Sequence, residues 1–249
     1  MIRVLPSIEA AHQARLELAR RGLDFTKRDR WRLVLPVRVL RRLGLTRAPF
    51  LPDPIKAWDV LLAVEQLTQA CRPEDPILDL GCKDSEILPC LAALGFIDLH
   101  GIDLDPSVSR QPTFQGIQWH VGDLYQGGFK TGQFTAVTAI STIEHGIDVK
   151  RLGAEVSRLL RPDGLFVFST DYHAQKLDTS NLCRFGMDWT IFSREEIIAL
   201  LQQFERDGLF PVGEISLDQD TTPIRWMGRR YTFLFGVLRK RKICPISWS

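Results

Sequence analysis

The sequence predicts an α/β protein with a doubly wound, mostly parallel sheet and helices on both of its faces. From residue 76 onward, short apolar runs alternate with helical patterns, which is the order typical of parallel sheets. Of the 249 residues, 45% are hydrophobic and 25% are charged, which is an ordinary globular balance. The longest uncharged apolar stretch, Tyr231–Leu238, is far shorter than the roughly 20 residues of a membrane-spanning helix. These observations exclude a disordered chain and an integral membrane protein.

Helices are expected where apolar residues recur at helical spacing between capping signals. Ser7 is placed to cap a helix over residues 7–21, which ends before Gly22. Residues 27–43 mix arginine with large apolar residues, and Pro36 divides them into two pieces. Ser193 and Glu196 form a capping-box pattern at the start of a further helix. The remaining helices are expected over residues 55–70, 86–94, 149–160 and 193–206.

Seven strands are expected from apolar runs bounded by turn residues. The last two are expected to form a closing hairpin. The strands cover residues 77–80, 97–102, 116–121, 134–140, 165–169, 212–217 and 231–238.

Charge is unevenly distributed along the chain. Residues 1–47 carry 12 Lys/Arg against 4 Asp/Glu, a net charge of +8, whereas residues 48–249 carry 20 against 26, a net charge of −6. We therefore expect a basic helical segment over residues 1–53 and a main domain over residues 54–249. The basic segment indicates an anionic partner or a membrane surface, and a solvated face is the simpler alternative. No stable nucleic-acid complex is expected.

The five cysteines include no C-x-x-C pair, and the N-terminus lacks the apolar core of a secretion signal. We expect reduced cysteines, no metal site, and a cytoplasmic protein that is able to rest on a membrane surface.

Glycine or polar side chains follow four consecutive expected strands. Gly81 ends the first strand, Asp103 lies 22 residues later at the end of the second, and Asp123 follows the third. The fourth is followed by residues 141–145, Ser-Thr-Ile-Glu-His. Because ligands of doubly wound folds bind at the carboxyl ends of the strands, these residues predict one binding site.

The chain here resembles the class I S-adenosylmethionine-dependent methyltransferases, over roughly residues 54–240. The pieces that carry the resemblance are ILDLGC (77–82), GIDLDP (101–106), VGDL (121–124), FTAVTAISTIEH (134–145), LLRPDGLFVFST (159–170) and FSREEI (192–197). The resemblance implies a Rossmann-like sheet of seven strands, the last antiparallel, and S-adenosylmethionine as cofactor.

The resemblance also implies roles for individual residues. The first glycine loop approaches the methionine part of the cofactor, Asp103 holds the ribose, and Asp123 lies near the adenine amino group. One departure is that Lys83 and Ser85 stand where the family usually has glycine, and their side chains could crowd the cofactor. The residues expected to bind the cofactor are Asp79, Gly81, Cys82, Asp103, Leu104, Asp123, Leu124 and Ser141.

His145 is the candidate catalytic base, because an imidazole beside the expected methyl position suits a hydroxyl acceptor. Alternatively it only braces its loop, and Asp171 and His173 are then the reserve candidates. The aromatic residues 185–192 either cover the substrate or belong to the core.

We expect O-methylation of a small molecule, sugar or glycan. The alternatives are an RNA-directed methyltransferase that uses the basic arm, and a non-catalytic relative that binds a partner. The chain lacks the Asn/Asp-Pro-Pro-Tyr/Phe tetrapeptide of many nucleic-acid amino-methyltransferases. It also lacks the G-x-G-x-x-G loop of nicotinamide enzymes.

Overall fold

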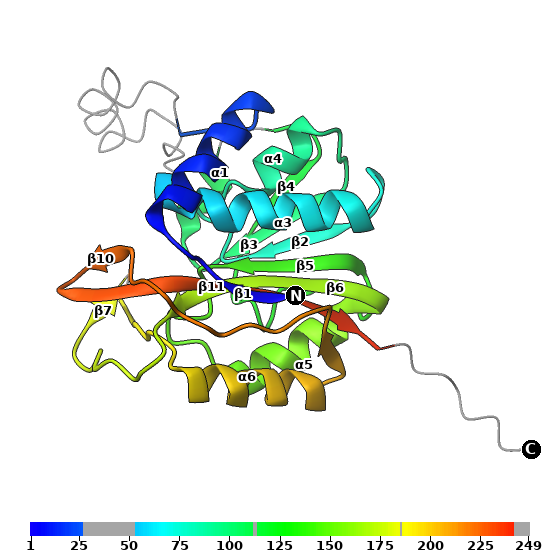
Figure 1. Ribbon diagram of the computed structural model, residues 1–249. Helices are drawn as coiled ribbons and strands as arrows, with labels where there is room; N and C mark the ends of the chain where they lie inside the picture. Colours follow the sequence, from blue (N-terminus) through cyan, green and yellow to red (C-terminus); the bar gives the residue numbers. More distant parts are fainter. Residues whose placement is uncertain (27–52, 112–113, 185, 242–249) are drawn as a thin grey trace, which may run out of the picture. The chain divides into compact units, whose positions relative to one another are not determined.

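The computed structural model describes residues 1–26, 53–111, 114–184 and 186–241 (Figure 1). The chain forms two compact units: unit 1 comprises residues 1–4 and 128–249, and unit 2 comprises residues 5–127. The expected helical pieces on either side of Pro36 lie outside the described residues. The expected domain boundary between residues 53 and 54 stays a prediction.

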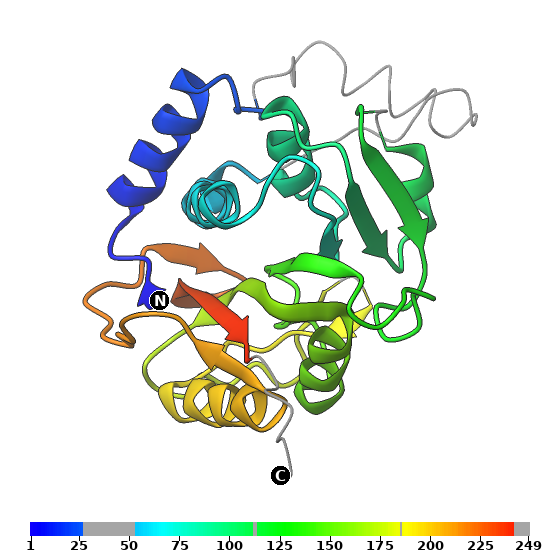
Figure 2. The same cartoon turned by 90° about the vertical axis from the view of Figure 1, so that its right-hand side faces the viewer.

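Unit 2 contains three parallel strands in the order β2-β3-β4. These strands are β2 (Ile77–Leu80), β3 (Leu99–Asp103) and β4 (Ile117–Val121). The helices are α1 (Ile8–Arg20), α3 (Ala57–Ala70) and α4 (Ile87–Ala93), with 3-10 turns η1 (Pro54–Lys56) and η2 (Pro106–Arg110). Helices α1 and α3 lie side by side (Figures 1 and 2).

Unit 1 has the strand order β1-β11-β6-β5. Strands β5 and β6 are parallel, and the long strand β11 runs antiparallel to β6. Helices α5 and α6 lie side by side along the strands (Figure 2). The elements are β1 (Ile2–Val4), β5 (Phe134–Ile140), α5 (Val149–Leu159), β6 (Leu160–Tyr172), β7 (Cys183–Arg184), β8 (Met187–Asp188), α6 (Arg194–Arg206), β9 (Leu209–Pro211), β10 (Ile224–Trp226) and β11 (Arg229–Lys240).

The α/β class, with mostly parallel strands and an antiparallel strand near the C-terminus, is confirmed. The side chains of β2 and β5 are buried throughout, as expected for strands that are covered on both faces. The predicted caps also form. Ser7 accepts a hydrogen bond from the backbone N–H of Ala10, and Ser193 and Glu196 complete a reciprocal capping box.

The expected strand over residues 212–217 is wrong. This segment was expected to pair with β11. In the structure, three other strands, β9, β1 and β10, pair with successive parts of β11. Gly213 adopts a left-handed φ of +73°, which interrupts an extended run. In this segment only Ile215 makes a bridge, and its partner is Ile2. The strands β1, β9 and β10 were missed because each has three residues, too few to show an alternation.

Strand β6 is longer than the expected strand over residues 165–169. It begins directly after α5 at Leu160 and continues to Tyr172. The turn residues Asp163 and Gly164 fall within it, and its register against β5 shifts near its start. Within the described residues, no helix combines the length and apolar character needed to cross a membrane.

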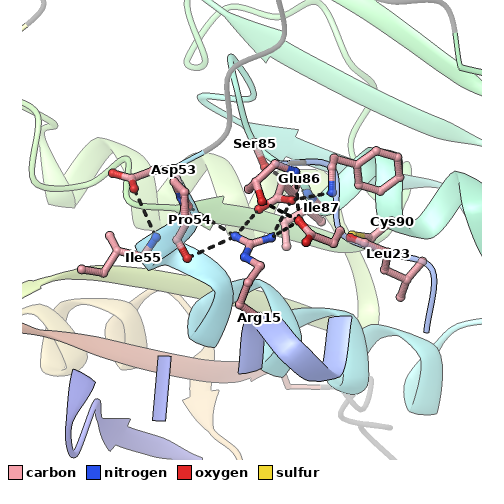
Figure 3. Close-up of polar contacts among 12 residues, drawn as sticks. Arg15, Leu23, Asp53, Pro54, Ile55, Ser85, Glu86, Ile87 and Cys90 are labelled. Atoms are coloured by element: carbon pink, nitrogen blue, oxygen red, sulfur yellow. Dashed lines mark hydrogen bonds and ion pairs between the residues drawn. The ribbon is translucent and has the colours of Figure 1, made fainter. Parts of the chain in front are cut away.

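The guanidinium of Arg15 on α1 connects four segments of unit 2 (Figure 3). It donates two hydrogen bonds, of 2.9 and 2.8 Å, to the carboxylate of Glu86 at the start of α4. It also reaches the Asp24 carboxylate at 3.3 Å and the carbonyl oxygens of Asp53 and Pro54 at 3.4 and 3.3 Å. The side chain of Glu86 is only 1% exposed and that of Arg15 12%. The pair is therefore largely shielded from water.

A second polar contact joins β3 and β4. The ring nitrogens Nδ1 of His100 and Nε2 of His120 lie 3.2 Å apart, and Nε2 of His100 lies 2.9 Å from the carboxylate of Asp98. Burial, and then the neighbouring His100, lower the pKa of His120 below the usual value of histidine.

We expect Arg15→Met to lower the free energy of unfolding by about 3–5 kcal/mol, because it leaves the carboxylate of Glu86 buried without its cation. Urea unfolding measures this loss. Arg20→Met is the matched control, because Arg20 is 71% exposed and surface pairs contribute about 0–1 kcal/mol. Equal stabilities of the two variants would contradict the assigned importance of the Arg15–Glu86 pair.

We expect unfolding stability to fall as the pH decreases from neutral through the ordinary histidine pKa toward the lower pKa of folded His120. In that window the unfolded chain binds the proton that folded His120 resists, so acid favours unfolding. His120→Gln should reduce this dependence, and His12→Gln, at an exposed position of α1, should not. Urea unfolding at several pH values checks this, and unchanged slopes in His120→Gln would refute it.

Candidate functional site

The loop after β2 turns sharply at Gly81, which has a left-handed φ of +69°. The backbone N–H groups of Gly81 and Cys82 both donate to the carbonyl oxygen of Ile102, at 2.9 and 3.3 Å, and so hold the loop against β3. Within the loop, Asp84 is the other left-handed residue, with φ +61°. Lys83 and Ser85 therefore need no glycine-like backbone, which explains how this loop forms without the usual glycines.

The carboxylate of Asp103 lies at the centre of this end of unit 2. Its Oδ2 accepts from the backbone N–H of Lys83 at 3.0 Å, and its Oδ1 accepts from the backbone N–H of Asp105 at 2.8 Å. Each carboxylate oxygen is able to accept two hydrogen bonds, so one acceptor position remains on each oxygen. Two vicinal hydroxyls, as on a ribose, suit these two positions. The geometry of Asp103 thus fits the expected cofactor.

Cys82 and Asp79 lie beneath the loop, and both are buried. Burial, with smaller effects of the Asp79 and Asp103 charges, raises the pKa of the Cys82 thiol well above its usual value. The thiol packs where Gly101 leaves room: a Cβ at residue 101 would lie 2.7 Å from its sulfur and 2.9 Å from the ring of Trp119. The Cys82 side chain is thus part of the core.

Asp123 and Leu124 follow β4 and are half-buried. The backbone N–H of Gly122 donates to the carbonyl oxygen of Asp103 at 2.9 Å, which brings this loop beside the one after β3. The carboxylate of Asp123 accepts from the backbone N–H of Tyr125 at 2.9 Å. Leu104 is 60% exposed. In unit 2 the structure therefore brings together the residues predicted after β2, β3 and β4.

Ser141 and His145 lie in unit 1, on the loop after β5. Ser141 has a positive φ of +50°, unusual for a residue other than glycine, and its N–H donates to the backbone oxygen of Ser169 at 3.1 Å. The N–H of His145 donates to the carbonyl oxygen of Thr142 at 3.1 Å, and its ring is half-buried. Between them Glu144 is buried, and its carboxylate accepts from the hydroxyl of Thr170 at 3.3 Å.

Asp171 lies within β6 and is buried. Its carboxylate accepts from the indole N–H of Trp189 at 2.8 Å. His173 follows β6, and its Nδ1 contacts the backbone of Gln175. Asp171 is therefore a buried strand residue and does not lie on a solvated loop.

The aromatic segment at residues 185–192 contributes buried side chains. Trp189, Ile191 and Phe192 are all buried, and the Trp189 ring packs edge-on against Trp226 at 4.7 Å between centroids. The backbone N–H of Thr190 donates to the carbonyl oxygen of Glu144 at 2.9 Å. The segment thus joins the core and also supports the loop that carries His145.

Two polar contacts were missed by the sequence reasoning. Lys83 forms an ion pair with Asp105, although the sequence reasoning treated Lys83 only as an obstacle to the cofactor. The spacing of two acids, Asp103 and Asp105, was the available signal. The contact of Glu144 with Thr170 was missed because it joins the loop after β5 to strand β6, 26 residues away in sequence.

Comparison with protein families identifies the region that contains these loops. Residues 78–168 match the family model described as "Methyltransferase domain". This match covers the central part of the chain and is a likeness to methyltransferase domains. The matched region runs from β2 into β6 and includes the expected cofactor loops as well as the loop of His145.

Solved methyltransferase structures share the fold. An S-adenosylmethionine-dependent methyltransferase from Mesorhizobium loti is 18% identical, with a TM-score of 0.53, over 73% of this chain and 97% of that one. Geranyl diphosphate C-methyltransferase from Streptomyces coelicolor A3(2) is 17% identical, with a TM-score of 0.57, over 72% and 78%. Phosphoethanolamine N-methyltransferase 2 from Haemonchus contortus is 14% identical, with a TM-score of 0.56, over 73% and 52%. No curated protein matches the sequence.

Proposed function

We propose that this methyltransferase binds S-adenosylmethionine at the strand ends of unit 2 and methylates a hydroxyl of a small molecule, sugar or glycan. The observation that carries the cofactor part is the carboxylate of Asp103, held by two backbone N–H groups with one acceptor position left on each oxygen. Asp123 and Leu124 supply the neighbouring loop, and Leu104 supplies an exposed apolar side chain. The neighbour from Haemonchus contortus is solved with S-adenosyl-L-methionine and that from Streptomyces coelicolor with S-adenosyl-L-homocysteine, which supports the choice of cofactor.

Methyl transfer requires the acceptor oxygen to be aligned with the methyl group more than it requires chemical activation of either. Bound S-adenosylmethionine supplies a methyl group on a sulfonium, whose sulfur departs with the bonding electron pair. The protein's part is to hold the acceptor oxygen in line with that carbon and to receive the hydroxyl proton. We assign the proton to the imidazole of His145. The loop of His145 is fixed by the contact of Thr190 with Glu144, which favours a defined position for the ring.

The acceptor class rests on the sequence. No Asn/Asp-Pro-Pro-Tyr/Phe tetrapeptide follows β5, which favours an oxygen over a planar base nitrogen. The net charge of +8 over residues 1–47 remains the reason to expect an anionic partner or a membrane surface for that segment. An RNA acceptor and a non-catalytic binding protein are the outcomes that would replace this proposal. Transfer of labelled methyl groups from the cofactor into fractionated cell extract distinguishes them.

We expect Asp103→Ala to weaken S-adenosylmethionine binding about ten- to hundredfold, because hydrogen bonds to a charged group contribute about 1.5–3 kcal/mol. Isothermal titration calorimetry measures the affinity, with circular dichroism as the check on folding. Asp220→Ala, the same change at an exposed position of unit 1, is the control. Unchanged affinity of a folded Asp103→Ala protein would refute the site, and Asp123→Ala should lose less.

We expect His145→Ala to lower turnover about 10²–10⁴-fold while cofactor affinity barely changes, because a positioned base contributes about that much. The wild-type rate should rise with pH as the imidazole of His145 loses its proton and becomes able to act as a base. His12→Ala, at an exposed position, is the control. Identical pH profiles for wild type and His145→Ala would remove His145 as the base and favour Asp171 or His173.

A further inference from the structure

Lys83 makes two contacts, one with the last residue of β3 and one with the loop after it. Its backbone N–H donates to Oδ2 of Asp103 at 3.0 Å, and its ammonium group pairs with the carboxylate of Asp105. The first contact needs only a backbone, and a glycine at this position would also make it. The second needs the side chain of lysine. Lys83 therefore adds an attachment between the two loops that the usual family sequence lacks.

Asp105 connects the ion pair with Lys83 to the carboxylate of Asp103. The backbone N–H of Asp105 donates to Oδ1 of Asp103 at 2.8 Å, so the position of residue 105 helps to set the orientation of that carboxylate. The side chain of Asp105 also accepts from the backbone N–H of Ser107 at 2.8 Å and caps η2. The hydrogen bond with Lys83 is the main reason why the pKa of Asp105 falls to about 2. Asp105 thus stays charged and paired across the physiological range.

We propose that Lys83 is a positioning residue, which orients the ribose-binding carboxylate of Asp103 through its ion pair with Asp105. The inference rests on the proposed function, since it assumes that Asp103 receives the ribose of S-adenosylmethionine. It reverses the simple expectation that a lysine here crowds the cofactor. The side chain is directed to Asp105, and the closed set of contacts among residues 83, 103 and 105 braces the carboxylate from both of its oxygens.

The proposal distinguishes two parts of the cofactor. If Lys83 acts through Asp103, then its loss weakens binding of adenosine, which has the ribose but no methionine. Loss of Lys83 should also weaken the binding of S-adenosylmethionine, and by the same factor. If Lys83 instead contacts the carboxylate of the methionine part, adenosine binding stays unchanged. If Lys83 only stabilised the fold, its loss would lower thermal stability but would not reduce the affinities for adenosine and S-adenosylmethionine by the same factor.

The experiment is isothermal titration calorimetry of adenosine and of S-adenosylmethionine with the full chain. Lys83→Met should lower both affinities about three- to fivefold, the effect expected for a partly exposed ion pair. Lys83→Arg should restore both to near the wild-type values. Asp105→Asn should resemble Lys83→Met, and the double variant should lose no more than the larger single loss, because both changes break one contact. Arg72→Met, at an exposed position of unit 2, is the control for lost charge.

Three results would overturn the inference and leave the proposed function standing. The first is unchanged affinities in Lys83→Met, and the second is a loss confined to S-adenosylmethionine. The third is additive losses in the double variant, which would contradict the route through Asp105. If the wild-type chain bound neither ligand, the proposed function itself would fail, and this inference with it. Thermal unfolding of each variant separates loss of the contact from loss of the fold.

Discussion

The buried ion pair of Arg15 with Glu86 is the contact on which the organisation of unit 2 depends. Glu86 follows the loop of Gly81 and Lys83 and begins α4, so its position fixes where that loop ends. Its carboxylate also accepts from the backbone N–H of Phe25, beyond the end of α1. A buried carboxylate is costly unless it is paired, which makes the docking of α1 a condition for burying Glu86. The N-terminal helix is thus part of the support of the candidate cofactor loop.

From that support, the site is built mainly by backbone groups. Gly81 and Cys82 are held by the carbonyl oxygen of Ile102, and Gly122 is held by that of Asp103. Parallel strands bring these loops to one edge because their carboxyl ends lie together. The carboxylate of Asp103 receives N–H groups from two different loops. The orientation of the Asp103 carboxylate therefore depends on the positions of the loops after β2 and β3.

Local patterns in the sequence were enough for the strands and helices with long apolar runs. β2 and β5 begin and end where predicted, and the capping box of Ser193 and Glu196 forms. The closing hairpin was wrong, because the choice of partner for β11 depends on competition among distant segments, which no local alternation reveals. Asp103 was found because it stands directly after a strand. The role of Lys83 was missed because it depends on a contact 22 residues away that only the fold creates.

The guanidinium of Arg15 also joins segments that are far apart in the sequence. It contacts Asp24 and the carbonyl oxygens of Asp53 and Pro54, so the residues on either side of the basic stretch 27–52 meet at one group. The same guanidinium also holds the carboxylate of Glu86, at the end of the candidate cofactor loop. The entry to the basic stretch, its exit and the cofactor loop are therefore fastened at a single point, and a change that moves Asp24 or Asp53 acts on the cofactor loop through one side chain.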